Sequence, residues 1–377
     1  MKDSRLSRRE FVRDSVVGAA ALAAGASMAG VVSVGNAAKV DTSKIVSYNP
    51  DMEYRRCGKT NWMVSSVCLG GHWKRVDIMV PGLFQGGNWL GLNINNPGFE
   101  KNRYDVVGRC IERGINYIDA CTHLETQAYS KALKGRRDKM YLGWSWYEHE
   151  ARSAQWRPAK MLLRALDEGM QMAKEQYVDL WRITCNVDGR RGPDGKYIMT
   201  HTEADSEQIA EALDKAKKAG KARMTGLSSH DRVWLSYMME KFPDQIDAVV
   251  TPYTAKTKAL PKDSFFDAVK QCNCGFFGIK PFSGTSAFKG DSSPDSPTKE
   301  EDNQIARLII RSILCNPAIT APIPGLINPE QVDNVAKAVK EPRGLTAEEK
   351  AELDLVMDRA WARLPYHYQW LKDWEWV

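Results

Sequence analysis

The chain has 377 residues, of which 43% are hydrophobic and 27% charged, and its formal net charge is +6. This length and hydrophobic content allow a large buried core, in one domain of barrel size or in two smaller ones. The positive charge is spread along the chain, so nucleic acid is not an expected partner. The eight cysteines are scattered rather than arranged as a disulfide framework, and only Cys272 and Cys274 are close in sequence, so the cysteines need not pair.

The first 38 residues have the pattern of an export signal. Residues 7–13 (SRREFVR) place two arginines before a bulky apolar residue, and a weakly hydrophobic run rich in Ala and Gly follows. This pattern resembles a twin-arginine signal, with cleavage expected near Ala37 or Ala38. The run is also about long enough for a membrane anchor, although Ala and Gly contribute little insertion energy. We therefore expect residues 1–38 to engage the twin-arginine export machinery and the mature protein to be periplasmic or otherwise exported.

After a linker at residues 39–51, strand-like segments alternate with segments of helical periodicity. One of the helices is expected in residues 206–221, with Ser206 as its N-cap. Strict alternation indicates a parallel sheet with right-handed crossovers, and eight units favour a closed (β/α)₈ barrel over an open sheet. No Gly-x-Gly-x-x-Gly motif follows an early strand, which disfavours a Rossmann domain. The eight predicted strands lie within residues 62–71, 116–120, 139–145, 177–185, 222–228, 247–253, 275–282 and 318–325.

Two connecting segments, at residues 72–102 and 186–205, are longer than this alternation requires. In a barrel both would lie over the C-terminal mouth, where ligands bind. The first contains Trp73, Phe84 and Trp89, which would suit a lid that excludes water from a ligand, or would pack back on the barrel.

Several segments resemble, in order, the sequence landmarks of the aldo-keto reductase family. MEYRRCGKTNWMVSSVCLGG is similar to the opening hairpin and first strand, and GINYIDACTH, YVDLWRI, GKARMTGLSSH, GFFGIKPFSG and AITAPIPGLINPEQVDN are similar to later landmarks. The resemblance implies a TIM barrel of aldo-keto reductase type with an N-terminal β-hairpin at residues 52–341, followed by a C-terminal helix and aromatic tail at residues 342–377. It also implies a nicotinamide cofactor extended across the mouth and hydride transfer to a carbonyl.

The family's catalytic set is an Asp, a Tyr acid, a Lys that lowers the pKa of the Tyr, and a His that orients the carbonyl. The resemblance assigns the Asp to Asp119. The Tyr, Lys and His positions hold Leu124, Ser145 and Thr184 instead. His123 would replace the Tyr as general acid, because an imidazole titrates near neutrality without a neighbouring lysine. It would otherwise be a loop histidine that contacts solvent.

A metal site is a further alternative, formed by Cys121, His123 and Cys185 together with Asp119. Strand alternation argues in part against this convergence, and no metal is predicted.

The nucleotide-binding positions retain more of the family pattern. Ser228 and Ser229 lie where the family has a Ser-Asn pair for the nicotinamide carboxamide, and Lys280 and Ser283 would line the phosphate side of the seventh strand. A loop and helix start would hold the adenosine phosphate end, since a helix N-terminus binds anions. This loop has no Lys or Arg for a 2′-phosphate, so the cofactor is NAD(P) with no expected preference for NADP. The loop and helix residues are Pro324, Gly325, Gln331 and Asn334.

The sequence thus predicts an exported, nicotinamide-dependent oxidoreductase of aldo-keto reductase type that acts on a small carbonyl or alcohol. The alternative is a catalytically inactive barrel retained as a nucleotide- or ligand-binding module, which the loss of Tyr, Lys and His favours. The aromatic C-terminal tail would contact a ligand or partner, or would cover an apolar barrel wall. Neither the substrate nor the oligomeric state is predicted.

Overall fold

A computed structural model describes residues 41–377 except 72, 74, 85–91 and 186–200. The predicted signal peptide, Trp89 and most of the second long connecting segment therefore lie outside the described residues. Thr42–Val377 form one unit, which contains the whole of the predicted barrel. Within the described ranges, no helix has the length and apolar character needed to cross a membrane.

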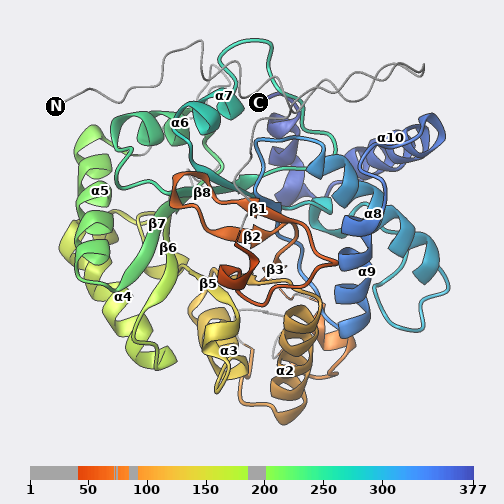
Figure 1. Ribbon diagram of the computed structural model, residues 1–377, viewed down its shortest axis with the longest axis horizontal. Helices are drawn as coiled ribbons and strands as arrows, with labels where there is room; N and C mark the ends of the chain where they lie inside the picture. The colour runs from red at the N-terminus through yellow and green to blue at the C-terminus, as the bar shows by residue number, and fades with distance from the viewer. Residues whose placement is uncertain (1–40, 72, 74, 85–91, 186–200) are drawn as a thin grey trace. The chain divides into compact units, whose positions relative to one another are not determined.

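Eight parallel strands form the central sheet, and each pairs with the next one in chain order (Figure 1). The backbone N–H groups of Cys68 and Gly70 donate to the carbonyls of Pro322 (3.1 Å) and Pro324 (2.8 Å), and Gly70 forms a parallel bridge with Gly325. These contacts join the first strand to the last, which confirms the predicted (β/α)₈ barrel. The strands are β3 (Leu69–Gly70), β4 (Tyr117–Asp119), β5 (Tyr141–Trp144), β6 (Val178–Thr184), β7 (Ala222–Ser228), β8 (Ala248–Pro252), β9 (Gly275–Ile279) and β10 (Ala321–Pro322).

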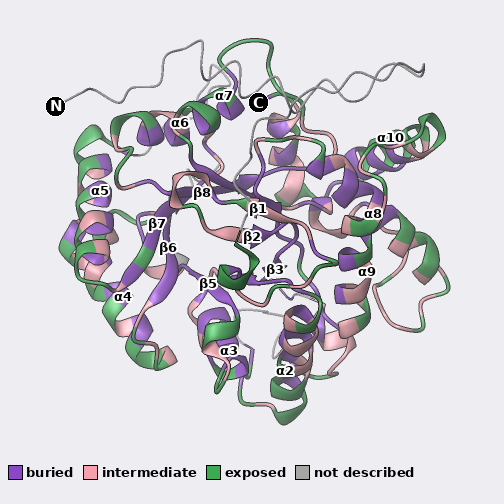
Figure 2. Ribbon diagram, in the orientation of Figure 1, coloured by how far each residue is buried: buried purple, intermediate pink, exposed green. Residues whose placement is uncertain are grey.

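The barrel strands are buried on both faces, as expected for a parallel sheet covered by helices (Figure 2). Every residue of β5 and β6 is buried. Most of these side chains are apolar, but Asp119 of β4 and Arg182 and Thr184 of β6 are polar and buried as well. Because buried polar groups need hydrogen-bonding partners, these three side chains mark a place where the barrel interior is not a simple hydrophobic core.

Helices follow the strands and surround the barrel, as predicted. The prediction that Ser206 caps the helix in residues 206–221, which is α5 (Glu203–Lys218), was wrong. Thr202 is the N-cap, because its hydroxyl accepts the N–H of Asp205 (3.1 Å) while the Asp205 carboxylate accepts the N–H of Thr202 (2.8 Å). The helices are α2 (Pro97–Glu112), α3 (His123–Ala132), α4 (Ala159–Ala173), α5 (Glu203–Lys218), α6 (Arg232–Lys241), α7 (Phe265–Gln271), α8 (Lys299–Leu314), α9 (Pro329–Lys340) and α10 (Ala347–Ala362).

The predicted N-terminal hairpin is present as the antiparallel strands β1 (Tyr54–Arg56) and β2 (Met63–Ser65). It contacts residues that immediately precede barrel strands: the Ser65 N–H donates to Asn116 Oδ1 (2.9 Å), and Arg56 Nη2 donates to Asn273 Oδ1 (3.1 Å). The hairpin therefore lies at the N-terminal end of the barrel, and the C-terminal end is left for ligands.

The C-terminal tail lies at the other end of the barrel. Its 3₁₀ helix η10 (Tyr366–Trp374) stacks the Trp370 ring on His230 with a centroid distance of 3.8 Å, and Trp374 Nε1 donates to the His230 carbonyl (3.1 Å). The N–H of Val377 donates to the carbonyl of Lys258 (2.9 Å). Since His230 and Lys258 follow β7 and β8, the tail covers one side of the barrel mouth.

Candidate functional site

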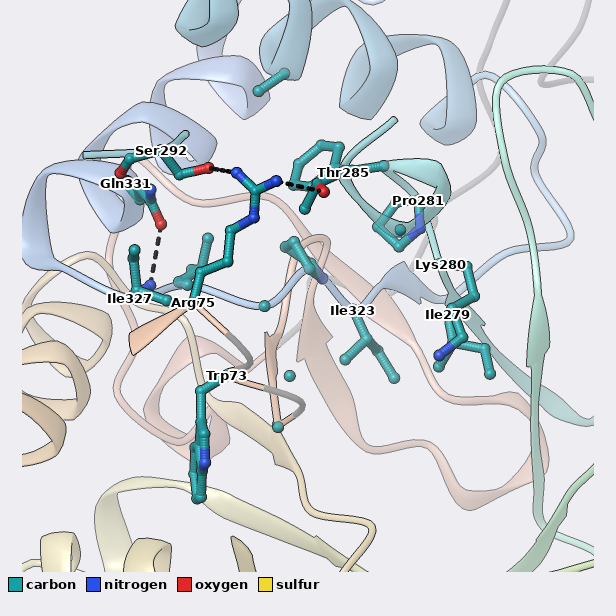
Figure 3. Close-up of a pocket in the computed structure, with 18 of the residues that line it drawn as sticks. Trp73, Arg75, Ile279, Lys280, Pro281, Thr285, Ser292, Ile323, Ile327 and Gln331 are labelled. Carbon is teal, nitrogen blue, oxygen red and sulfur yellow. Dashed lines mark hydrogen bonds between the residues drawn. The ribbon is translucent and has the colours of Figure 1, made fainter. Parts of the chain in front are cut away.

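A cavity of about 720 Å³ begins at the C-terminal ends of the barrel strands. Its inner end is lined by Asp119, Arg182, Thr184 and Ser228, and its outer part runs between the segment after β9 and the N-terminal end of α9 (Figure 3). The volume falls within the range of small-molecule and cofactor sites, about 300–1,000 Å³. The cavity is therefore large enough for an extended ligand that reaches from the barrel to its periphery.

The inner end of the cavity contains a buried ion pair. Arg182 Nε lies 2.7 Å from Asp119 Oδ1, and Arg182 Nη2 lies 2.6 Å from Asp119 Oδ2. The Tyr117 hydroxyl donates a further hydrogen bond to Asp119 Oδ1 (3.1 Å). Burial alone would lower the pKa of Arg182, but the charge and hydrogen bonds of Asp119 raise that pKa well above its ordinary value. The Arg182 guanidinium therefore stays charged at the barrel mouth, beside the Asp119 carboxyl group that binds it.

A second polar group lies beside this pair and is centred on Glu150. Its Oε2 accepts hydrogen bonds from the Ser145 hydroxyl (2.8 Å) and the Thr184 N–H (2.7 Å), and its Oε1 accepts one from the Trp146 N–H (2.8 Å). The hydroxyls of Ser145 and Thr184 are themselves 2.7 Å apart. These two hydroxyls stand at the positions where the family resemblance would place a Lys and a His.

Burial raises the pKa of Glu150 to about 7, although its three hydrogen bonds and the charge of Arg182 act in the opposite direction. The side chain is 2% exposed. Glu150 is therefore a buried carboxyl group that gains or loses a proton near neutral pH.

The structure separates the two predicted catalytic residues. Asp119 lines the cavity, whereas His123 is not among the lining residues. Thr122 caps α3 in a capping box with Glu125, which makes His123 the first residue of that helix. Its Nδ1 lies 3.1 Å from Glu148 Oε1, outside the cavity. Leu124, at the family's Tyr position, packs against the hydrophobic core.

Six of the eight predicted cofactor-binding residues line the cavity, namely Ser228, Lys280, Pro324, Gly325, Gln331 and Asn334. Ser229 does not, because its hydroxyl donates to the Cys185 carbonyl (2.7 Å) and accepts the Asp231 N–H (3.0 Å). Ser283 is fully buried beside the cavity, and its hydroxyl has no hydrogen-bond partner among the described residues. An unpartnered buried hydroxyl next to Lys280 suits a polar ligand group such as a phosphate oxygen.

The amides predicted to hold the nucleotide are already used within the protein. Gln331 Oε1 accepts the N–H of Ile327 (3.0 Å; Figure 3), and Asn334 Oδ1 accepts a hydrogen bond from Arg307 Nη1 (2.7 Å). These bonds shape the loop after β10 and the first turns of α9. The N-terminal end of α9 is used within the protein as well, because the N–H of Gln331 donates to Asn328 Oδ1 (2.8 Å).

The tertiary structure adds cations that the sequence did not reveal. Arg75, in the segment after β3, extends across the outer cavity and donates to Ser292 Oγ (3.1 Å) and Thr285 Oγ1 (3.0 Å; Figure 3). Its segment is held in place by Trp73, which packs against Phe99 with a ring distance of 5.2 Å. Arg75 thus connects the segment after β3 to the segment after β9.

Lys299, at the start of α8, also lines the cavity near α9, where it pairs with Glu330 (2.5 Å). In the described lining, five side chains are cationic (Arg75, Arg152, Arg182, Lys280 and Lys299) and three are acidic (Asp119, Asp302 and Glu330). This excess of positive charge favours an anionic ligand. The cavity size and the cations together fit a dinucleotide with its diphosphate in the outer part.

The comparisons with known proteins agree with this geometry. A model of the aldo/keto reductase family matches residues 86–358. The chain belongs to the aldo-keto reductase family. No curated protein sequence matches it significantly.

Solved aldo-keto reductases share the fold. The holo form of aldo-keto reductase AKR11C1 from Bacillus halodurans is 17% identical, with a TM-score of 0.53 over 84% of this chain and 99% of that one. An aldo-keto reductase from Klebsiella pneumoniae in complex with NADP and acetate is 15% identical, with a TM-score of 0.54 over 81% of this chain and 95% of that one. Family membership suggests NAD(P)-dependent oxidoreduction for this aldo-keto reductase, while its catalytic positions depart from the family pattern.

Within the described ranges, no group of three His, Cys, Asp or Glu side chains is arranged to hold a metal ion. The thiols of Cys121 and Cys185 also differ from those of reactive cysteines, because burial raises the pKa of Cys121 to about 12 and that of Cys185 well above its ordinary value.

Sequence reasoning missed Arg182, Glu150 and Arg75. Arg182 could have been found, since a charged residue inside an otherwise apolar strand needs a partner within the barrel. Nothing local marks Glu150 or Arg75, because their roles depend on which segments the fold brings beside them.

Proposed function

We propose that this protein is an exported, NAD(P)-dependent oxidoreductase that reduces a small carbonyl compound or oxidises the corresponding alcohol. The observation that carries the proposal is one continuous cavity. The Arg182–Asp119 pair lies at its inner end, and cationic side chains and the N-terminal end of α9 line its outer end. A hydride donor and its acceptor carbonyl would share the inner end of this cavity.

The outer part of the cavity would hold the nucleotide. Arg75 and Lys280, which line the outer cavity, would bind the diphosphate oxygens by charge-assisted hydrogen bonds. The N-terminal end of α9 would bind the adenosine phosphate, and Lys299 is near enough to this helix to pair with a 2′-phosphate. Ser228 would hold the carboxamide at the inner end.

The inner part would stabilise the reacting carbonyl. A bound reduced nicotinamide supplies the hydride, and negative charge then develops on the carbonyl oxygen. Arg182 is a fixed cation in a buried site, so it would stabilise this charge without reorganisation. Asp119 holds the guanidinium in place through two hydrogen bonds. In this proposal the Arg182–Asp119 pair takes over the electrostatic work that the family assigns to its Tyr and Lys.

The test is binding followed by turnover. The purified mature protein is titrated with NADH and NADPH by fluorescence, and reduction of 4-nitrobenzaldehyde is followed by loss of NADPH absorbance. We expect saturable binding, and we expect Arg182→Met to abolish turnover while binding persists. Arg164→Met, at an exposed arginine of α4, is the matched control and should behave like the unmodified protein. Absence of binding to either nucleotide would refute the proposal.

A second function, a nucleotide-binding module without catalysis, is favoured by the replacement of three catalytic residues by Leu124, Ser145 and Thr184. Tight nucleotide binding with no turnover across a panel of small aldehydes and ketones would support this function instead.

Export is part of the proposal and rests on the sequence of the first 38 residues. Changing both Arg8 and Arg9 to Lys should retain the protein in the cytoplasm of a host that has twin-arginine transport. Unchanged periplasmic recovery of this variant would contradict export by that route.

A further inference from the structure

The cavity is connected to Glu150 by two hydroxyl groups. We propose that Thr184, Ser145 and Glu150 form a proton relay that delivers the proton needed for carbonyl reduction. This inference rests on the proposed oxidoreductase function and adds a proton source to it, since the family's Tyr acid is absent at Leu124.

The geometry of the relay is continuous. Thr184 lines the cavity at the C-terminal end of β6, whereas Ser145 and Glu150 lie behind it, outside the lining. The two hydroxyl oxygens are 2.7 Å apart, and Ser145 Oγ is 2.8 Å from Glu150 Oε2. Both distances are typical of good O–H···O hydrogen bonds. Because Thr184 faces the ligand space, it is the member that would contact a substrate oxygen.

Each hydroxyl can pass on one proton while receiving another. With Glu150 protonated, Glu150 donates to Ser145, Ser145 donates to Thr184, and Thr184 donates to the substrate oxygen. With Glu150 ionised, the directions reverse, and Thr184 accepts from Arg182 Nη1 (3.4 Å) or from a substrate alcohol. The backbone N–H groups of Trp146 and Thr184 hold the carboxyl group in position in both states.

The step is balanced. A reduced nicotinamide, when bound, would supply the hydride of the new C–H bond; the carbonyl π electrons would move to oxygen, and this oxygen would take the proton of Thr184. Thr184 takes the proton of Ser145, and Ser145 takes the proton of Glu150. The products are the alcohol, the oxidised nicotinamide and the Glu150 carboxylate, which regains a proton from solvent after product release. Alcohol oxidation follows the same path in reverse.

Glu150 is better suited to donate the proton than the charged and titratable groups around it. Arg182, on β6, stays charged, and its Nε and Nη2 bind the two carboxylate oxygens of Asp119 at 2.7 and 2.6 Å. Burial raises the pKa of the thiols of Cys121 and Cys185 far above neutrality, so neither releases a proton readily. The pKa of Glu150 is about 7, which is close to the value that favours proton transfer at physiological pH.

Three variants interrupt the relay at successive positions: Thr184→Val, Ser145→Ala and Glu150→Gln. The assay measures kcat for 4-nitrobenzaldehyde at saturating NADPH between about pH 5 and pH 9. For the unmodified protein, kcat should fall above about pH 7. Each variant should lower kcat by roughly 100-fold, with little change in KM and with loss of this pH dependence. Glu168→Gln, an exposed change on α4, is the control and should leave the profile intact.

The conservative variant Thr184→Ser keeps a hydroxyl at the cavity and should retain most of the activity of the unmodified protein. Ser145→Ala leaves the buried charge in place, so it tests the relay even if Glu150→Gln folds poorly. Wild-type kcat and pH profile in both Thr184→Val and Ser145→Ala would overturn the relay. Failure of the unmodified protein to bind nucleotide, or to reduce any carbonyl, would refute the proposed function first and the relay with it.

Discussion

The ion pair between Asp119 and Arg182 gives the sharpest prediction about stability. Its two hydrogen bonds are 2.6 and 2.7 Å long, and the two side chains are 6% and 2% exposed. Asp119→Asn keeps the size of the side chain but removes its charge, which leaves the Arg182 guanidinium uncompensated inside the barrel. Breaking a buried pair in this way costs about 3–5 kcal/mol, a large part of a total stability of about 5–15 kcal/mol.

Removing both charges should be milder than removing one. The double variant Asp119→Leu with Arg182→Met leaves no unpaired charge, and replacing a buried pair by apolar residues is often close to neutral. The Tyr117 hydroxyl then loses its acceptor, which costs about 1–3 kcal/mol. We therefore expect the double variant to be more stable than Asp119→Asn and less stable than the unmodified protein.

The measurement is the free energy of unfolding in urea at neutral pH, followed by circular dichroism and by tryptophan fluorescence. Glu168→Gln is the control, because it removes a pair of similar length (2.7 Å) on the exposed face of α4 and should cost no more than about 0.5 kcal/mol. A loss below about 1 kcal/mol for Asp119→Asn, or a double variant no more stable than the single one, would refute the reasoning.

Three further predictions concern Glu150, Arg75 and Trp374. The pKa of Glu150 is raised from 4.5 to about 7 in the folded state. The contribution of Glu150 to the free energy of unfolding is therefore complete below pH 4.5 and is lost as the pH rises through 7. Glu150→Gln should remove about 3 kcal/mol of this pH-dependent stability. The measurement is urea unfolding at several pH values, and a free energy of unfolding that changes with pH equally in the variant and the unmodified protein would contradict the raised pKa of Glu150. Arg75→Ala should weaken NADPH binding about tenfold in a fluorescence titration and reduce its salt dependence, whereas unchanged affinity would separate Arg75 from the ligand. Trp374→Ala should lower stability by about 3–5 kcal/mol in thermal unfolding because the ring is 1% exposed, while Trp376→Ala, at a ring 50% exposed, should have little effect.

Much of the architecture could be predicted from the sequence. Eight apolar segments separated by amphipathic ones specify a parallel barrel, because each strand must be covered on both faces and connected by a helix. The same pattern places Asp119 at the C-terminal end of a strand, and therefore at the mouth of the barrel. The predicted cap of α5 was wrong because Ser206 and Thr202 are both good caps, and the capping box with Asp205 favours Thr202.

The chemistry of the mouth was decided by the tertiary structure. Arg182 pairs with Asp119, which is 63 positions away in the sequence, and Arg75 donates to Thr285, which is 210 positions away. His123 lies four positions from Asp119 in the chain, yet the start of α3 directs it to Glu148 instead. Periodicity and propensity act over a few neighbouring residues, so they determine the elements. The partner of a buried charge depends on which elements become neighbours, and only the folded barrel brings Arg182 to the cavity and Glu150 behind Thr184.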